Sequence, residues 1–410
     1  MKGAWAVRVL GIALLVGMPA CGGAPEAAGG PKRDPLTGGP FPALLVTQAQ
    51  FDEQQGTDGK TKYVPGAAKL TIIRRTDAGW KSVVLEDPES NVFHKAMPYQ
   101  GGIMTIGGTQ ALLRVWRFSG GSWSQQTHWN PKFGGKFDRL RDIEEGDVDG
   151  DGRKELVIAT HDQGVIGVVH PDEGWRVEEA DRETGLFVHE IEIGDVDGDG
   201  VAEFYATPSQ PNRPDQEQAG EVRVYRYAPD GYVEKLVEAP GDTHAKEILV
   251  ADTDGDGRPE LFVAWEGAVD RTGALARPVE IKRYTWKKGA YQAQDVGSLQ
   301  DRQLRAMAAG DVNRDGKIDL VAGAMRSGLW VFEQTQGGWK KTSVDSNSSG
   351  YEHPVHLADL DRNGTLEIYV ASEDQQQLRQ YQWDGTEFRK AVVALLEKGD
   401  ITWNIMSGEF

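Results

Sequence analysis

The sequence predicts an all-β fold, a seven-bladed β-propeller whose blades each have four antiparallel strands. Three observations predict it: an acidic segment of 15 residues recurs five times, a two-strand hairpin recurs seven times, and the two chain ends resemble the two halves of one further repeat. Glycine is frequent, with 51 of 410 residues, which favours short strands joined by turns. Four-stranded units repeated around an axis describe a propeller.

The recurring segments divide the chain into blades. The acidic segment aligns without gaps at Gly146–Thr160, Gly194–Pro208, Ala251–Trp265, Gly310–Ala324 and Ala358–Ser372. The hairpins lie at Lys69–Leu85, Ala111–Thr127, Gly164–Ala180, Gly220–Val237, Val279–Val296, Gly328–Val344 and Leu378–Leu395. An aromatic residue follows each hairpin turn, and we expect these residues to serve packing: Trp80, Trp123, Trp175, Tyr232, Tyr291, Trp339 and Phe388.

The ends of the chain predict how the ring closes. Ile401–Phe410 resembles the first strand of a repeat, and Ala43–Thr47 resembles the second strand. We therefore expect the C-terminal strand to pair with the first blade as its innermost strand. Such closure removes free strand edges that would otherwise invite aggregation.

Composition excludes several classes of protein. The net charge of −18 argues against a nucleic-acid partner, because neutralising phosphates needs clustered Lys and Arg. A single Cys excludes a disulfide framework and a Cys-based zinc site. No nucleophile elbow, P-loop or dinucleotide fingerprint is present in the expected strand–helix context.

The N-terminus has the pattern of an export signal. Lys2 and Arg8 precede the short apolar run Val9–Val16, and the only cysteine follows at Cys21. This arrangement resembles a bacterial lipobox, which implies a signal peptide over 1–20 and lipidation of Cys21; an ordinary cleaved signal peptide is the alternative. Residues 21–42 are rich in Gly, Pro and Ala and predict a flexible tether to a propeller over 43–410. Gly22 carries no acidic retention signal, so we expect a lipid anchor in the outer membrane of a bacterial envelope.

Each acidic segment contains a loop with the ligand pattern of a hard cation. Oxygen-bearing side chains stand at positions 1, 3, 5 and 9, a Gly stands at position 6, and position 7 would add a backbone carbonyl. In positional order, the candidate ligands are Asp147, Asp149, Asp151, Arg153 and Glu155; Asp195, Asp197, Asp199, Val201 and Glu203; Asp252, Asp254, Asp256, Arg258 and Glu260; Asp311, Asn313, Asp315, Lys317 and Asp319; and Asp359, Asp361, Asn363, Thr365 and Glu367. Oxygen-only donors suit Ca²⁺ better than zinc or copper.

The loops resemble the FG-GAP/VCBS repeats of integrin-α-type calcium-binding propellers, and the resemblance covers Pro42–Phe410. It implies about five structural Ca²⁺ ions, each between the first and second strands of a blade. The charge distribution agrees: without the 18 carboxylates of the loops, acidic and basic residues balance at 45 each. Metal-free loops would hold strongly repelling carboxylates, so we expect Ca²⁺ to stabilise the fold.

A second set of polar residues recurs five residues before the leading Gly or Ala of each repeat, and the next residue is acidic in several repeats, as at Glu190 and Glu247. We expect it at the start of the innermost strands, about 16 Å from the acidic loops and around one mouth of the central channel. The candidate ligand-binding residues are Arg141, His189, Glu190, Lys246, Glu247, Arg305, His353 and Trp403. They could bind an anionic or sugar ligand, or they could be polar only because a channel is wet.

Two classes of function remain. The first is a monomeric, lipid-anchored and calcium-stabilised binding or scaffold protein that recognises an envelope protein or a glycan. The second is a carbohydrate-active enzyme resembling polysaccharide lyases, or a lectin, on a calcium-rich propeller. An enzyme needs a cleft with paired carboxylates or a basic residue of shifted pKa. The fold itself does not choose between these functions.

Overall fold

The computed structural model describes residues 41–55, 60–76, 78–135, 138–211 and 218–410. The chain divides into two units, Met1–Asp34 and Pro35–Phe410, and all described residues lie in the second. The predicted signal peptide, Cys21 and most of the predicted tether lie outside the described residues.

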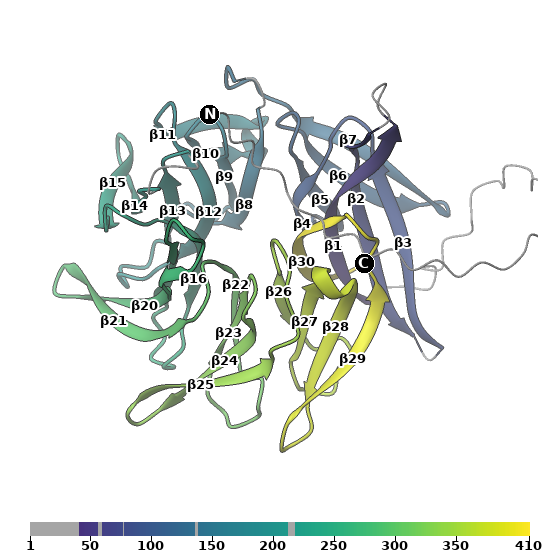
Figure 1. Ribbon diagram of the computed structural model, residues 1–410. Helices are drawn as coiled ribbons and strands as arrows, with labels where there is room; N and C mark the ends of the chain where they lie inside the picture. The colour runs from purple at the N-terminus through teal and green to yellow at the C-terminus, as the bar shows by residue number, and fades with distance from the viewer. Residues whose placement is uncertain (1–40, 56–59, 77, 136–137, 212–217) are drawn as a thin grey trace, which may run out of the picture. The chain divides into compact units, whose positions relative to one another are not determined.

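Seven four-stranded antiparallel sheets follow one another in the second unit (Figure 1). From the innermost strand outward, blade 1 holds β30 (Ile401–Glu409), β1 (Pro42–Gln55), β2 (Thr61–Thr76) and β3 (Gly79–Asp87); blade 2 holds β4 (Phe93–Tyr99), β5 (Gly102–Gly107), β6 (Leu113–Ser119) and β7 (Ser122–Trp129). Blade 3 holds β8 (Leu140–Gly146), β9 (Glu155–Thr160), β10 (Val165–His170) and β11 (Arg176–Arg182); blade 4 holds β12 (Phe187–Gly194), β13 (Glu203–Ser209), β14 (Val222–Ala228) and β15 (Gly231–Glu238).

The remaining three blades repeat the same order. Blade 5 holds β16 (Ala245–Ala251), β17 (Glu260–Trp265), β20 (Val279–Lys287) and β21 (Ala290–Leu299); blade 6 holds β22 (Leu304–Gly310), β23 (Asp319–Ala324), β24 (Gly328–Thr335) and β25 (Gly338–Asp345); blade 7 holds β26 (Val355–Ala358), β27 (Glu367–Ser372), β28 (Gln377–Trp383) and β29 (Phe388–Leu395). A small hairpin of β18 (Ala268–Val269) and β19 (Leu275–Arg277) projects from blade 5, and short 3₁₀ turns occupy Pro171–Glu173 and Glu373–Gln375.

The predicted closure of the ring is confirmed. β30 pairs antiparallel with β1, with Ala43 opposite Gly408 and Val46 opposite Ile405. Two backbone hydrogen bonds between Phe41 and Phe410 extend this pairing, at N···O distances of 3.1 and 3.2 Å. Each innermost strand contacts the innermost strands of both neighbouring blades, including β26 with β30 and β30 with β4. The described blades therefore form a closed ring.

The hydrophobic core is divided among the interfaces between blades. Seven buried clusters occur in the described residues, one for each pair of adjacent blades. The second strand is the most buried, and every residue of β5, β9, β13, β17, β23 and β27 is buried. The seven recurring aromatics pack one against each cluster, so their predicted packing role is confirmed.

We expect a chain that ends at Asp400 to aggregate or to become sensitive to protease, because β1 would then expose an unpaired edge. The point variant Ile405→Ala, which shortens a side chain that is 1% exposed, should lower the free energy of unfolding by about 2–5 kcal/mol. The control Leu395→Ala alters a side chain that is 79% exposed and should change it by less than about 0.5 kcal/mol. Size-exclusion chromatography and chemical denaturation measure these effects. A monomeric truncated chain of unchanged stability would contradict the role of β30.

Candidate functional site

The five acidic loops share one hydrogen-bonded geometry. Each joins the innermost strand to the second strand, in blades 3 to 7. In every loop the Asp at position 1 accepts a hydrogen bond from the backbone N–H of position 6, at 2.7–3.0 Å. The carboxylate at position 9 accepts one from the backbone N–H of position 2, at 3.0–3.4 Å. The recurring sequence therefore builds the same loop five times.

Two residues in each loop adopt left-handed backbone conformations. The sequence indicated one of them, the Gly at position 6, which has φ +85° at Gly152. Position 4 is the other, and it is Gly150 in the first loop but Arg314 and Arg362 in the last two, with φ of +62° and +57°. Because this region is unfavourable for residues with a Cβ atom, those two arginines are held there by the rest of the loop.

The carboxylates of the loops converge as a cation site requires. Donor atoms lie within 4.8 Å of one another in Asp147/Asp149/Asp151, Asp195/Asp197/Asp199, Asp252/Asp254/Asp256 and Asp359/Asp361/Glu367. The carboxylates at position 9 are buried, and burial raises the pKa of Glu155, Asp319 and Glu367 to about 7. Asp319 Oδ1 and Glu367 Oε1 are buried without a hydrogen-bond partner. Oxygen donors with unused buried acceptor atoms fit a hard cation such as Ca²⁺.

Arginine side chains also reach the loops, which the sequence pattern did not indicate. Arg226 of β14 donates to Asp197 at 2.8 Å and to Glu203 at 3.1 Å. Arg75 of β2 pairs with Asp361 at 2.6 Å, and Arg283 of β20 lies 3.5 Å from Glu260. These residues come from other strands or blades, so only the folded chain brings them to the loops.

A β-bulge lies near the start of six innermost strands, and it explains the second recurring set. In five of these strands one residue has no partner opposite it, in β12 His189 and Glu190 together face Thr207, and the pairing register shifts at each place. A bulge re-aims the local side chain, which otherwise follows the alternation of the strand. The bulge residues, which we call the bulge ring, are His94, Arg141, His189, Lys246, Arg305 and Trp403.

The bulge ring brings residues of separate blades together. The Arg141 guanidinium lies 5.1 Å from the centre of the Trp403 ring, whose indole also meets His94 edge to face at 4.7 Å. Arg141 lies 3.9 Å from Glu352 of the segment before β26, and Arg305 pairs with the same carboxylate. These contacts join residues of blades 1, 2, 3, 6 and 7, which are not all neighbours in the ring. The structure thus gathers five of the predicted residues with His94.

Several polar atoms in this region are buried without a partner among the described residues. They include donors and acceptors: His189 Nε2, His244 Nε2, Arg305 Nε, Trp403 Nε1 and Asn404 Oδ1. The rings of His189 and His244 lie 6.4 Å apart. Burial, reinforced by the neighbouring Arg305, lowers the pKa of Lys246 to about 8.

The predicted acidic residues beside the bulges, Glu190 and Glu247, have raised pKa values. Burial raises the pKa of Glu190 well above its usual value, and repulsion from Asp142 and Glu247 adds to the effect. Burial also raises the pKa of Glu247 to about 8. Glu247 accepts a hydrogen bond from the backbone N–H of Met307 in the next blade, at 2.5 Å. Part of this acidic set therefore serves the pairing of adjacent blades.

The structure places His353 away from the channel, which corrects its expected position. His353 is fully buried, has φ +44°, and its Nδ1 donates to the carbonyl oxygen of Ala324 at 2.6 Å. Its Nε2 then accepts from the hydroxyl of Ser348 at 2.7 Å. The preceding residue, Glu352, is the one that reaches Arg141 and Arg305. Counting five residues back from the leading residue of the repeat gives His353 and so misses Glu352 by one position. The same count does not find His94, because blade 2 lacks the acidic repeat.

No helix of the described residues is long and apolar enough to cross a membrane.

Comparison with known proteins agrees with the repeat architecture. A family model described as an FG-GAP-like repeat matches residues 195–263 and 311–370, whereas no curated protein matches the sequence. A solved structure from Bacteroides uniformis, described as a "putative 6-phosphogluconolactonase", is 12% identical with a TM-score of 0.53, over 89% of this chain and 99% of that chain. A protein from Bacteroides fragilis with the same description has 12% identity and a TM-score of 0.49, over 90% and 98% of the two chains. Sqt1 from Chaetomium thermophilum has 12% identity and a TM-score of 0.49, over 85% and 82%.

The comparisons support the architecture and no more. The likeness to the Bacteroides uniformis structure shows the fold alone, because so few residues are identical. The matched family model covers the acidic loops of blades 4 to 7. This chain therefore combines FG-GAP-like repeats with a seven-bladed β-propeller.

We expect His353→Ala to destabilise the protein, because it removes the two buried hydrogen bonds that the imidazole makes with the Ala324 carbonyl and the Ser348 hydroxyl. The loss should be about 2–4 kcal/mol in the free energy of unfolding. His353 also stays neutral in the fold, since burial lowers its pKa to about 4. The unfolded chain binds the proton first, so the contribution of His353 to stability should fall as pH decreases from about 6.5 to about 4. Chemical denaturation of the wild type, His353→Ala and His353→Gln at several pH values checks both effects. Equal stability of the wild type and His353→Ala would contradict the first effect, and a pH dependence that is the same in all three proteins would contradict the second.

Proposed function

We propose that this chain, a propeller with FG-GAP-like repeats, is a calcium-stabilised binding protein of the bacterial envelope that is held there by a lipid on Cys21. Its ligand site is the bulge ring, and its ligand is an envelope glycan or a hydroxyl-rich surface of an envelope protein. The acidic loops stabilise the scaffold and take no part in recognition.

The observation that carries this proposal is the set of buried polar atoms without partners at the bulge ring. Leaving such an atom unpaired costs about 1–3 kcal/mol, so it is retained where a ligand or bound water completes the bond. The set mixes donors, such as Trp403 Nε1, with acceptors, such as Asn404 Oδ1. Sugar hydroxyls both donate and accept, and the Trp403 ring adds an aromatic face.

The charges at the bulge ring favour a neutral polar ligand over a simple anion. Arg305 and Arg141 already lie beside Glu352. Lys95 of β4 pairs with Asp142 at 3.0 Å. Among the bulge-ring cations, Lys246 is the one with no close ion pair within the described residues. An anion would have to displace these carboxylates, whereas hydroxyl groups can bond to both partners.

Calcium would act as a cross-link within a blade. Each loop ties the innermost strand to the second strand, so a cation held by positions 1, 3, 5 and 9 resists separation of the two. The donor residues are those of the five predicted loops. The chain has a single Cys and so no internal disulfide to serve the same purpose.

A second candidate function is catalysis on a carbohydrate at the same place. It is favoured by one observation: burial lowers the pKa of Lys246 to about 8, while burial raises the pKa of nearby Glu266 to about 7. A base and an acid that titrate near neutral pH can exchange protons with a substrate. Turnover of a bound glycan would distinguish this function from binding alone.

The metal-free protein should bind about five Ca²⁺ ions, and Ca²⁺ should raise its melting temperature, because the cation binds the folded state only. The variant Asp197→Ala/Asp199→Ala should lose one ion and unfold blade 4 more easily. The control Asp230→Ala/Glu280→Ala removes two exposed carboxylates outside the loops and should lose none. Calorimetric titration and thermal unfolding measure both effects. One bound ion or none in the wild type would contradict the prediction.

Lys246→Gln should abolish ligand capture without lowering stability, because Lys246 makes no close ion pair that the fold needs. The control Lys235→Gln changes an exposed lysine on the outer strand β15 and should bind like the wild type. Binding is measured on a glycan array and by pull-down from solubilised envelopes, with and without chelator. If Lys246→Gln and Lys235→Gln capture the ligand equally well, the ligand site lies outside the bulge ring.

Cys21→Ser should release the protein from membranes into the soluble fraction, because the substitution removes the thiol that receives the lipid. Gly23→Ser leaves that thiol in place and should remain in the membrane fraction. Fractionation after a high-salt wash separates lipid anchoring from weak association. A Cys21→Ser variant that still sediments with membranes would contradict the anchor.

A further inference from the structure

One acidic loop differs from the other four because a histidine faces it. His170 is the last residue of β10, and its neighbour Val169 pairs with Leu156, the residue after Glu155. Its side chain is buried, with 6% of the residue exposed. Nδ1 lies 3.8 Å from Glu155 Oε1 and Nε2 lies 3.7 Å from Glu178 Oε2. Both distances exceed hydrogen-bonding range, and Nε2 is buried without a partner.

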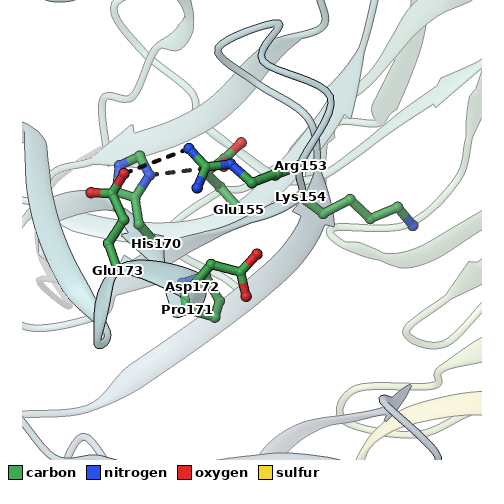
Figure 2. A pocket seen from close by; sticks show the side chains of 7 residues that line it. All are labelled: Arg153, Lys154, Glu155, His170, Pro171, Asp172 and Glu173. Atoms are coloured by element: carbon green, nitrogen blue, oxygen red, sulfur yellow. Dashed lines mark ion pairs between the residues drawn. The ribbon is translucent and has the colours of Figure 1, made fainter.

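The histidine completes a second converging group at this loop. Donor atoms of Asp149, Glu155 and His170 all lie within 4.8 Å of one another. Figure 2 shows His170 and Glu155 turned toward each other in the pocket beside the loop. Small side-chain movements from this spacing bring three donors to about 2.0–2.2 Å from one ion.

The same place in the other four blades carries no imidazole. Taken from the strand pairing, the equivalent residues are Arg226, Thr285, Glu333 and Gln382. None of them offers a neutral nitrogen that binds a metal. Among the converging groups of the described residues, only the group at the first loop includes a histidine.

In the first loop, an arginine of the loop itself binds one of the candidate oxygen ligands. Arg153 Nε donates to Asp151 Oδ2 at 2.8 Å, and the same guanidinium lies 3.7 Å from Glu173 (Figure 2). This pair occupies one oxygen of Asp151, whereas Asp149, Glu155 and His170 form a converging group of two carboxylates and one imidazole. Such a mixed nitrogen and oxygen set suits first-row divalent transition ions, whereas Ca²⁺ prefers six to eight oxygens.

We propose that the loop at Asp147–Glu155 is a transition-metal site, in which Asp149, Glu155 and His170 bind an ion of the Zn²⁺ class. This inference goes beyond the proposed calcium scaffold: the other four loops keep Ca²⁺, while at the first loop a zinc-class ion displaces the Ca²⁺ that binds in its absence, because both ions use Asp149 and Glu155. The protein would then carry two kinds of metal site, and a zinc-class ion would tie β10 to the acidic loop of blade 3.

The test titrates the full metal-free chain with Zn²⁺ and with Co²⁺, a spectroscopic substitute for Zn²⁺, in excess Ca²⁺. We expect one site, and Co²⁺ absorption typical of a nitrogen ligand. His170→Gln should weaken Zn²⁺ binding by at least about 10-fold. The control His128→Gln removes a histidine from β7 of blade 2 and should leave the affinity unchanged.

A gain-of-site variant keeps the proposal testable if His170→Gln folds poorly. Gln382→His places an imidazole beside Glu367 in blade 7 and should add a second Co²⁺ site to the wild-type background. Absence of Zn²⁺ binding by the wild type in excess Ca²⁺ would overturn the proposal, as would unchanged affinity in a folded His170→Gln variant. A wild-type protein that binds Zn²⁺ but no Ca²⁺ would overturn the proposed calcium scaffold and leave the zinc-class site intact.

Discussion

The pairing of β30 with β1 is the contact on which the rest of the structure depends. It joins residues more than 350 positions apart in the sequence and supplies blade 1 with its innermost strand. Each hydrophobic cluster is shared by two blades, so no blade has a core of its own. If β30 dissociated from β1, the hydrophobic clusters on both sides of blade 1 would lose packing contacts. The stability of the ring is therefore collective.

Four innermost strands, β8, β12, β16 and β22, link the two candidate sites. β8 carries Arg141 at its bulge and ends at Gly146, directly before Asp147 of the acidic loop. The same order recurs in β12, β16 and β22. Under the proposed function, a cation that held the end of such a strand would also hold its start, so metal binding and ligand geometry would be coupled through one short strand.

The inner edges of the strands explain why the centre is acidic. An innermost strand has no neighbour on one side, so its backbone N–H groups need other acceptors. Asp142 accepts from the N–H of Ile191 at 2.8 Å and Glu192 accepts from Val250 at 3.2 Å, each in the next blade. These carboxylates therefore have a structural role. The unpartnered atoms of the bulge ring differ from them, because those atoms form no hydrogen bond within the described residues.

The sequence by itself determined the number of blades, the closure of the ring, and the position and internal pattern of the five acidic loops. Repeats and spacing encode these features because each loop is built by contacts within about ten residues. Only the tertiary structure decided which side chains face the centre, since one bulge residue shifts every later side chain to the opposite face. The bulge in β4 adds His94 from a blade without the repeat. Blade 7 has no bulge between β26 and β27, and there the segment before β26 buries His353 and brings Glu352 to Arg141. His170 and Arg226 reach their loops from the third strand of the blade, and a pairing register between strands decides such contacts, which a linear motif does not contain.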